Sequence, residues 1–351
     1  MTRLRPIAAA VVAAALFGAG VPLAKVLVGQ VEAVPLAALL YLGSGVGLLL
    51  LQGSMALIGK RSRESGIARS DLSWLAGATL AGGVLAPIVL MTGLRNSPAA
   101  TASLLLNLEG AATAVLAALL FREHLGGRTW MAVLLVTGAG MVLSWNQGGR
   151  VGLAPAALLV VAACVLWGLD NNLSRRISGK NPVSLAAAKG LVAGAFSLVL
   201  ALTRGAALPD LRTSLLAMGL GFASYGVSIA LFIYAMRGLG AARTGALFAT
   251  APFIGTALSF AIFQERPNLQ FLVALPVMVV GAALLLGERH AHRHVHEPLE
   301  HEHRHRHDDH HHDHAHESGL TAVEHAHRHV HAPVEHEHPH LPDEHHRHGH
   351  G

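Results

Sequence analysis

Apolar residues fill long stretches of the first 288 residues, and short polar stretches separate them. About ten of these stretches are roughly twenty residues long, which is enough for a helix to cross a bilayer. In hydrocarbon every backbone N–H and C=O group must be paired within its segment, so each stretch is expected to be a helix. The predicted spans are residues 7–28, 34–58, 72–93, 98–121, 128–146, 152–173, 182–203, 212–235, 240–263 and 268–287.

The composition changes abruptly at residue 289. Hydrophobic residues make up 52% of the chain and charged residues only 13%, although a polar tail is included in both values. Of the 25 histidines, only His124 precedes residue 290. The 38 glycines lie mostly within the apolar spans, where small residues let membrane helices approach closely. We therefore predict an all-α membrane body of about ten transmembrane helices, followed by a disordered His-rich tail.

The basic residues of the loops predict the orientation of the body. If the N-terminus is cytoplasmic, the inner segments carry Arg3, Arg5, Lys60, Arg61, Arg63, Arg69, Arg122, Arg128, Arg175, Arg176, Lys180, Arg237 and Arg243. The outer loops then carry only Arg95, Arg150, Arg204, Arg212 and Arg266. Cytoplasmic loops are the ones that collect Lys and Arg, so both termini are expected in the cytoplasm, with the body in the cytoplasmic membrane. Cations spread over loops in this way do not indicate nucleic-acid binding.

The two halves of the body resemble each other in sequence. Within the first span of each half, Phe17-Gly18 aligns with Trp167-Gly168 at an offset of 150 residues. At the end of the fourth span, LFREHLGG around Glu123 aligns with IFQERPNL around Glu265 at an offset of 142. Five spans per half is an odd number, so the halves must cross the bilayer in opposite directions. We therefore predict two inverted repeats, residues 1–147 and 148–288, as in many secondary transporters, with the tail at 289–351.

This duplicated pattern resembles the EamA type of the drug/metabolite transporter superfamily over residues 7–287. The resemblance rests on the aromatic-Gly pair in the first helix of each half and on Arg-Glu or Gln-Glu at the end of the fourth. It implies ten helices, cytoplasmic termini, and export or exchange of small metabolites. The sequence departs from the family pattern at Glu109-Gly110, where a proline is common, and at Tyr41, near the usual place of an arginine. Pro252 retains the proline in the ninth helix.

Polar residues within the spans are the candidate binding residues, because a charge in the membrane costs about 2.5–3.5 kcal/mol on insertion scales. Glu109 lies near the middle of the fourth span, with Asn107 just before it. Its carboxylate is expected to bind a cationic group or a coupling proton; alternatively, it is a neutral side chain that hydrogen-bonds a neighbouring helix. Lys25, Glu123 and Glu265 lie near span ends, where they are expected to reach the interface or order loops.

A second polar group occurs in WGLDNNLSRR, which contains Asp170, Asn171 and Asn172. Lys189 lies about 10 Å into the next span from the same face, so an Asp170–Lys189 pair is expected. This pair is either a structural salt bridge or a gate that opens when substrate competes for one partner. The single cysteine, Cys164, lies in an apolar stretch and is expected to be a small buried thiol.

The tail contains a duplication of its own. HAHRHVHEPLEHEHRH from His290 recurs as HAHRHVHAPVEHEHPH from His325. Neutral imidazoles suit Zn, Ni and Co, and alternation places successive histidines on one side of an extended chain. We expect many overlapping sites of modest affinity rather than one fixed geometry. The candidate ligands are His290, His292, His294, His296, His301, His303, His305, His307, His310, His311, His312, His314, His316, His325, His327, His329 and His331.

The sequence therefore predicts a secondary transporter of small metabolites, with export as the expected direction. It contains no Gly-rich loop with Lys-Ser/Thr for ATP and no recognisable catalytic motif, so no enzyme activity and no required cofactor are expected. Two alternatives remain open. Ni, Co or Zn is itself the cargo, or the protein is a metal-responsive membrane regulator that transports nothing.

Overall fold

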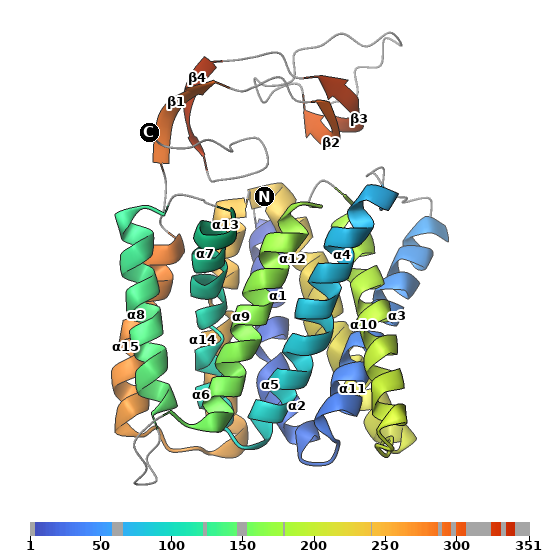
Figure 1. Cartoon of the computed structure of the whole chain (residues 1–351), viewed down its shortest axis with the longest axis vertical. Helices are drawn as coiled ribbons and strands as arrows, with labels where there is room; N and C mark the ends of the chain where they lie inside the picture. The colour runs from blue at the N-terminus through green and yellow to red at the C-terminus, as the bar shows by residue number, and fades with distance from the viewer. Residues whose placement is uncertain are drawn as a thin grey trace.

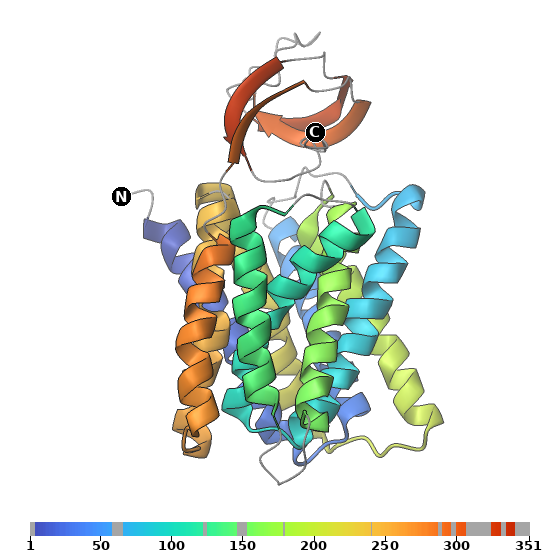
Figure 2. The same cartoon turned by 60° about the vertical axis from the view of Figure 1, so that its left-hand side comes forward.

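A computed structural model describes most of the body and parts of the tail. The described residues are 4–57, 66–121, 125–145, 153–177, 180–239, 241–286, 290–295, 300–306, 324–330 and 335–340. In the body the helices run side by side in one bundle (Figures 1 and 2).

The first half contains five spans, several of which consist of more than one helical element. In chain order the elements are α1 (Leu4–Gly18), α2 (Gly20–Val28), α3 (Ala33–Leu57), the 3-10 turn η1 (Arg69–Asp71), α4 (Leu72–Ala78), the π-helical η2 (Thr79–Leu85), α5 (Ala86–Arg95), α6 (Ala99–Leu105), α7 (Leu108–Phe121) and α8 (Gly127–Ser144).

The second half repeats this order. Its elements are α9 (Pro155–Arg175), α10 (Pro182–Thr203), α11 (Leu211–Gly221), the π-helical η3 (Phe222–Val227), α12 (Ser228–Leu239), α13 (Ala241–Phe248), α14 (Ala251–Phe263) and α15 (Leu269–Leu286). Among the described residues, eight helical stretches are long and apolar enough to cross a membrane, and Ala251–Phe263 and Leu269–Leu285 are shorter apolar helices. The predicted all-helical membrane body is confirmed.

The halves run in opposite directions through the bundle. α1 begins at the end of the bundle beyond which the strands lie, whereas α9 begins at the opposite end (Figure 1). The second spans of the two halves, α3 and α10, pack on each other through glycines. A Cβ at Gly190 would meet the backbone of Gly45, and one at Gly194 would meet the backbone of Leu42. Glycine therefore allows the backbones of the two halves to approach as membrane helices do.

The third and fourth spans of each half are irregular at matching places. The π-helical segments η2 and η3 lie in the third spans, about 142 residues apart. The fourth spans are interrupted at residues 106–107 and again at residues 249–250. The sequence predicted continuous helices here. At the first break, Asn107 Nδ2 donates to Leu104 O at 2.9 Å, so its side chain uses a carbonyl near the end of α6. At the second, Pro252 supplies no backbone N–H to the start of α14.

The described tail residues form four short strands in two antiparallel pairs. β1 (His290–Val295) pairs with β4 (Glu335–His340), and β2 (Glu300–Arg306) pairs with β3 (Glu324–Val330). The sequence predicted no regular structure in the tail, because its apolar residues are too few to form a core.

Candidate functional site

Glu109 lies where the fourth span is broken. It is in the first turn of α7, ten residues after Ala99 and twelve before Phe121. At 1.5 Å per helical residue, this places it about 15 Å or more from either end of the span, near the bilayer midplane. The N-terminus of a helix carries partial positive charge, which favours a carboxylate in its first turn. The break therefore provides a local reason for an acidic residue at this depth.

Asn171 from α9 connects to Glu109 across the α7–α9 contact. Its Nδ2 lies 3.0 Å from Glu109 Oε1 and 3.2 Å from Thr113 Oγ1. The Thr113 hydroxyl in turn donates to the Glu109 carbonyl at 2.8 Å. Glu109 is half-buried, and Asn171 is exposed at the surface of the bundle. We call Glu109, Thr113 and Asn171 the carboxylate site.

Asn172 has a different role from its neighbour. Its Nδ2 donates to Thr113 O at 3.0 Å and to Gly168 O at 2.8 Å, and the residue is buried. A Cβ at Gly168 would meet the backbone of Ala112 and Thr113, so α7 and α9 are in close backbone contact here. The structure places Asn172 in the packing of these helices, although the sequence proposed it as a substrate ligand. Asn107, another proposed ligand, bonds within its own chain segment as described above.

The expected Asp170–Lys189 ion pair is present. Lys189 Nζ on α10 lies 2.5 Å from Asp170 Oδ1 and 2.7 Å from Oδ2 on α9. Ser174 Oγ donates to Asp170 Oδ1 at 2.8 Å. A Cβ at Gly82 of η2 would overlap the Asp170 carboxylate, so glycine is needed there for the carboxylate to fit. Side-chain exposures of 20% for Lys189 and 11% for Asp170 show a pair that is largely withdrawn from solvent.

Aromatic side chains from both halves lie beside these polar groups. The Tyr41 hydroxyl and Trp167 Nε1 both donate to Gly82 O, at 2.7 and 3.0 Å. This carbonyl belongs to the π-helical segment η2, in which the altered backbone hydrogen bonding leaves carbonyl groups that side chains can bind. The Tyr41 ring stacks on Tyr225 at 5.7 Å between centroids, and Tyr225 meets Phe17 edge-on at 6.0 Å.

Sequence reasoning missed Thr113 and Tyr225 as members of this region. Thr113 follows Glu109 by four residues, a spacing that places both on one face of a helix, so this signal was available. Tyr225 gave no comparable signal, because one aromatic residue within an apolar span is ordinary. Cys164 is buried, and its Sγ contacts Leu105 O at 3.5 Å beside the break between α6 and α7.

Lys25 and Glu265 hold the turn between α5 and α6. Lys25 Nζ donates to Leu94 O at 2.5 Å and to Arg95 O at 2.9 Å at the end of α5. Glu265 accepts hydrogen bonds from the N–H groups of Ala99 and Ala100 at 2.9 and 3.1 Å, at the start of α6. Both charges match the helix ends that they face. Glu123, the repeat partner of Glu265, lies outside the described residues.

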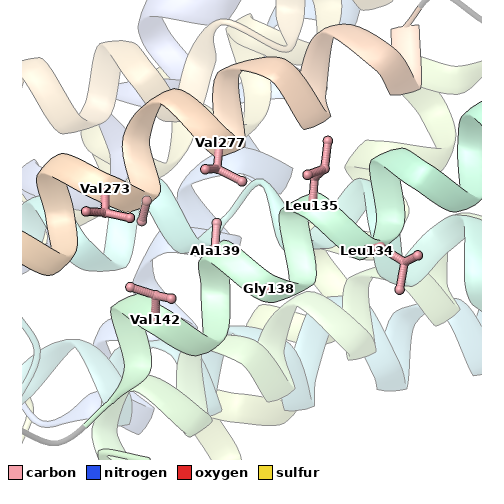
Figure 3. A pocket seen from close by; sticks show the side chains of 8 residues that line it. Leu134, Leu135, Gly138, Ala139, Val142, Val273 and Val277 are labelled. Atoms are coloured by element: carbon pink, nitrogen blue, oxygen red, sulfur yellow. The ribbon is translucent and has the colours of Figure 1, made fainter.

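A groove between α8 and α15 differs from these polar clusters. It has a volume of about 170 Å³ and is lined by Leu134, Leu135, Gly138, Ala139, Val142, Val273, Ala274 and Val277. Its lining side chains carry only carbon atoms (Figure 3). This groove offers no hydrogen-bonding side chain to a polar ligand, so the carboxylate site is the better candidate.

The predicted metal ligands of the tail fall into two groups. Those in described strands are His290, His292, His294, His301, His303, His305, His325, His327 and His329. Those outside the described residues are His296, His307, His310, His311, His312, His314, His316 and His331. In the described part of the chain, no group of three or more His, Cys, Asp or Glu residues is already placed to hold a metal.

Two inverted helical halves, broken fourth spans and a carboxylate near the midplane are typical of secondary transporters. The comparison with known families identifies the class: residues 4–145 and 154–287 each match the EamA-like transporter family. The chain belongs to this family, which is a family of transporters and not of enzymes. The protein is therefore a multi-pass membrane transporter with two EamA halves.

Individual relatives agree with this assignment. An uncharacterized transporter from Methanothermobacter thermautotrophicus is 29% identical over 299 residues, which cover 81% of this chain and 87% of that one. A protein of known crystal structure is 22% identical and has a TM-score of 0.57, covering 80% of this chain and 96% of the other. The structural likeness supports the fold alone.

Proposed function

We propose that the protein exports small metabolites that carry a cationic amine, and that Glu109 binds this amine near the bilayer midplane. The observation that carries the proposal is the half-buried Glu109 carboxylate at a broken helix, held by Asn171. A carboxylate at this depth is costly, so it is retained where a cation or proton neutralises it. Discontinuous helices near the midplane are where secondary transporters build substrate sites.

The neighbouring aromatic rings support an amine as the substrate group. Tyr41 stacks on Tyr225, and Trp167, which lies four residues before Asn171 on α9, donates to the same Gly82 carbonyl as Tyr41. The face of an aromatic ring attracts a cation within about 6 Å of its centroid. A carboxylate together with aromatic rings on neighbouring helices thus favours an amino-acid-like or polyamine-like substrate over an anionic one.

Exchange of a proton for substrate follows from the single carboxylate. One Glu109 side chain is neutralised either by a proton or by a bound amine, but not by both together. Release of the amine to the outside is then coupled to uptake of a proton, so a proton gradient drives export. Because the halves are inverted, rocking one half against the other exposes Glu109 to each face in turn.

Flux measurements in proteoliposomes test this proposal. We expect Glu109→Gln to reduce amine flux and its dependence on a pH gradient by about tenfold or more, because a hydrogen bond to a charged group contributes about 1.5–3 kcal/mol. Glu32→Gln makes the same chemical change at an exposed loop residue and is the matched control. Unchanged flux and unchanged pH dependence in Glu109→Gln would exclude Glu109 as the binding group.

For the tail we propose that it binds divalent transition metal in the cytoplasm, with both chain ends on that side of the cytoplasmic membrane. The loop charges support this orientation, and α1 begins and α15 ends at the same side of the bundle (Figure 1). Deleting residues 289–351 distinguishes the alternatives. Metabolite flux survives if the tail only binds metal, metal flux weakens if metal is the cargo, and a regulator shows no flux with or without the tail.

A further inference from the structure

The two copies of the tail repeat are aligned with each other in the structure. β1 begins the first copy and pairs with β4, which ends the second. β2 ends the first copy and pairs with β3, which covers the beginning of the second. From His290 to His301 is eleven residues, and from their partners His340 to His329 is also eleven. Both strand pairs therefore belong to one continuous antiparallel alignment of copy against copy.

This alignment places histidine opposite histidine at six positions. The pairs are His290–His340, His292–His338, His294–His336, His301–His329, His303–His327 and His305–His325. Residues two apart on a strand share one face of the sheet. Each two-stranded sheet therefore carries three histidine pairs in a row on one face. We call these the histidine rows.

The opposite face of each sheet carries matched charges. Arg293 lies opposite Glu337 in the first sheet, and Glu302 lies opposite Arg328 in the second. Arg306 and Glu324 form another such pair. Opposite charges at directly paired positions stabilise a sheet by about 0.2–1 kcal/mol per pair, and like charges destabilise it. The same alignment therefore pairs histidine with histidine and, at the positions between them, arginine with glutamate.

The contribution of these charge pairs is too small to keep such sheets folded without further interactions. A two-stranded sheet without a hydrophobic face is marginally stable at best in water. Few apolar residues occur in these strands, among them Val295 and Val330. A ligand that binds only the paired form would supply the missing stability, as metals do in small domains that fold on binding them.

We propose that divalent transition metal ions bind along the histidine rows and thereby hold the first copy of the tail repeat against the second. This inference rests on the metal-binding tail proposed above and specifies where the ions bind. Directly opposite residues in an antiparallel pair have Cβ atoms about 4.5–5.5 Å apart, a separation at which two imidazoles can share one metal ion. Two successive pairs contribute four imidazoles, the number of ligands that tetrahedral Zn²⁺ takes. Metal binding then requires both copies of the repeat.

Charge reversal tests the pairing without removing any histidine. In the full-length protein in detergent, Arg293→Glu with Arg328→Glu places like charges opposite each other at Glu337 and Glu302. We expect Zn²⁺ affinity, measured by calorimetric titration, to fall about tenfold, because two stabilising pairs become repulsive. An unpaired tail would respond in the opposite sense, since added acidic residues attract a cation. Adding Glu337→Arg and Glu302→Arg restores the pairing and the wild-type net charge, and is expected to restore affinity.

The outcomes separate this inference from the proposals on which it rests. Unchanged or increased Zn²⁺ affinity in the charge-reversed protein, or no recovery in the fourfold variant, overturns the paired arrangement while leaving a metal-binding tail in place. If the full chain binds no more Zn²⁺ than the protein lacking residues 289–351, metal binding by the tail fails as well. Amine export through Glu109 is measured by flux and is independent of both results.

Discussion

The first spans of the two halves, α1–α2 and α9, pack in the same way with different side chains. A Cβ at Gly18 would meet the backbone of Ala251 on α14, and one at Gly168 would meet the backbone of Ala112 and Thr113 on α7. Each first span therefore contacts the fourth span of the opposite half through a glycine. This contact fixes how the two halves fit together, and it needs no polar side chain.

The charged and amide side chains of the candidate site occur at only one of these two interfaces, the one between α7 and α9. Asp170 and Asn172 of α9 correspond to Gly20 and Pro22 in the first half, and Glu109 of α7 corresponds to Ala251. The interface between α1–α2 and α14, which contains Gly20 and Ala251, shows that the packing is compatible with small or apolar residues at these positions. The charged groups of α7 and α9 are therefore an addition to the fold, which is why we place the substrate there.

The largest effect is expected from breaking the Asp170–Lys189 pair, which has no counterpart at Gly20. Lys189→Met leaves the Asp170 carboxylate without its counterion, and losing one partner of a buried pair costs about 3–5 kcal/mol. Thermal unfolding in detergent measures this loss. The double variant Asp170→Leu with Lys189→Met is expected to recover most of it, because it leaves no unpaired charge.

Exchanging the two charges then separates a gate from a structural bridge. If Asp170→Lys with Lys189→Asp restores stability but not flux, the pair is a gate that substrate must open. Recovery of both properties indicates a structural bridge only. If Lys189→Met alone leaves the unfolding temperature unchanged, the close contact between these side chains contributes nothing to stability.

A smaller loss of stability, similar at both positions, is expected when the corresponding glycines Gly18 and Gly168 are replaced. Gly18→Ala and Gly168→Ala each place a methyl group against the backbone of the opposite half, and overpacking of this kind costs about 1–3 kcal/mol. Gly219→Ala is the control, because a Cβ there meets nothing within 4 Å. In the control, alanine is expected to stabilise α11 by up to about 1 kcal/mol. Unequal losses at Gly18 and Gly168 would show that the two interfaces are not equivalent.

The sequence predicted the spans, their inverted order and the Asp170–Lys189 pair, because each follows from hydropathy, parity or helix geometry. It did not predict the breaks at residues 106–107 and 249–250, because irregular backbone in a membrane depends on partners from other helices. Leu104 O accepts from Asn107 and Leu105 O contacts Cys164, and only the second contact comes from another span. Gly82 O accepts hydrogen bonds from Tyr41 and Trp167, which lie on two other spans, and no local sequence pattern reveals these contacts.

In the candidate site, too, the sequence identified some residues but could not assign their contacts. Glu109 was identified because a charge in an apolar span is conspicuous. Asn171 and Asn172 are adjacent and chemically identical, yet one contacts Glu109 and the other bonds the backbone of α7 and α9. The rotation of α9 about its axis decides between these roles, and packing against neighbouring spans sets that rotation.

A further comparison concerns the glutamates after the fourth spans. Glu265→Gln removes the charge that faces the N–H groups of Ala99 and Ala100, with an expected cost of about 1 kcal/mol in unfolding free energy. Glu32→Gln is again the control for loss of a carboxylate. The repeat predicts that Glu123→Gln has a similar effect. A large difference between Glu265→Gln and Glu123→Gln would show that the two halves are equivalent at their first spans but not after their fourth spans.

The smallest effect is expected at the aspartates that begin the third spans. Asp71 accepts from the N–H of Ala68 and lies 3.6 Å from Lys180, whereas Asp210 accepts from the N–H and hydroxyl of Thr213. The backbone N–H of Thr213, followed by its hydroxyl, lowers the pKa of Asp210 below its ordinary value of 3.8. The folded state thus favours the ionised form, so its contribution is complete above pH 3.8 and is lost as the pH falls through the lowered pKa.

Unfolding temperatures of the wild type and of Asp210→Asn between neutral pH and pH 3 measure this contribution. The difference between the two proteins is expected to be small and constant near neutral pH and to shrink only in the acidic part of the range. Screening is strong at this exposed position, so salt should reduce the difference further. A difference that instead grows as the pH falls would mean that protonated Asp210 is the form that the fold prefers, contrary to the hydrogen bonds that Thr213 donates to it.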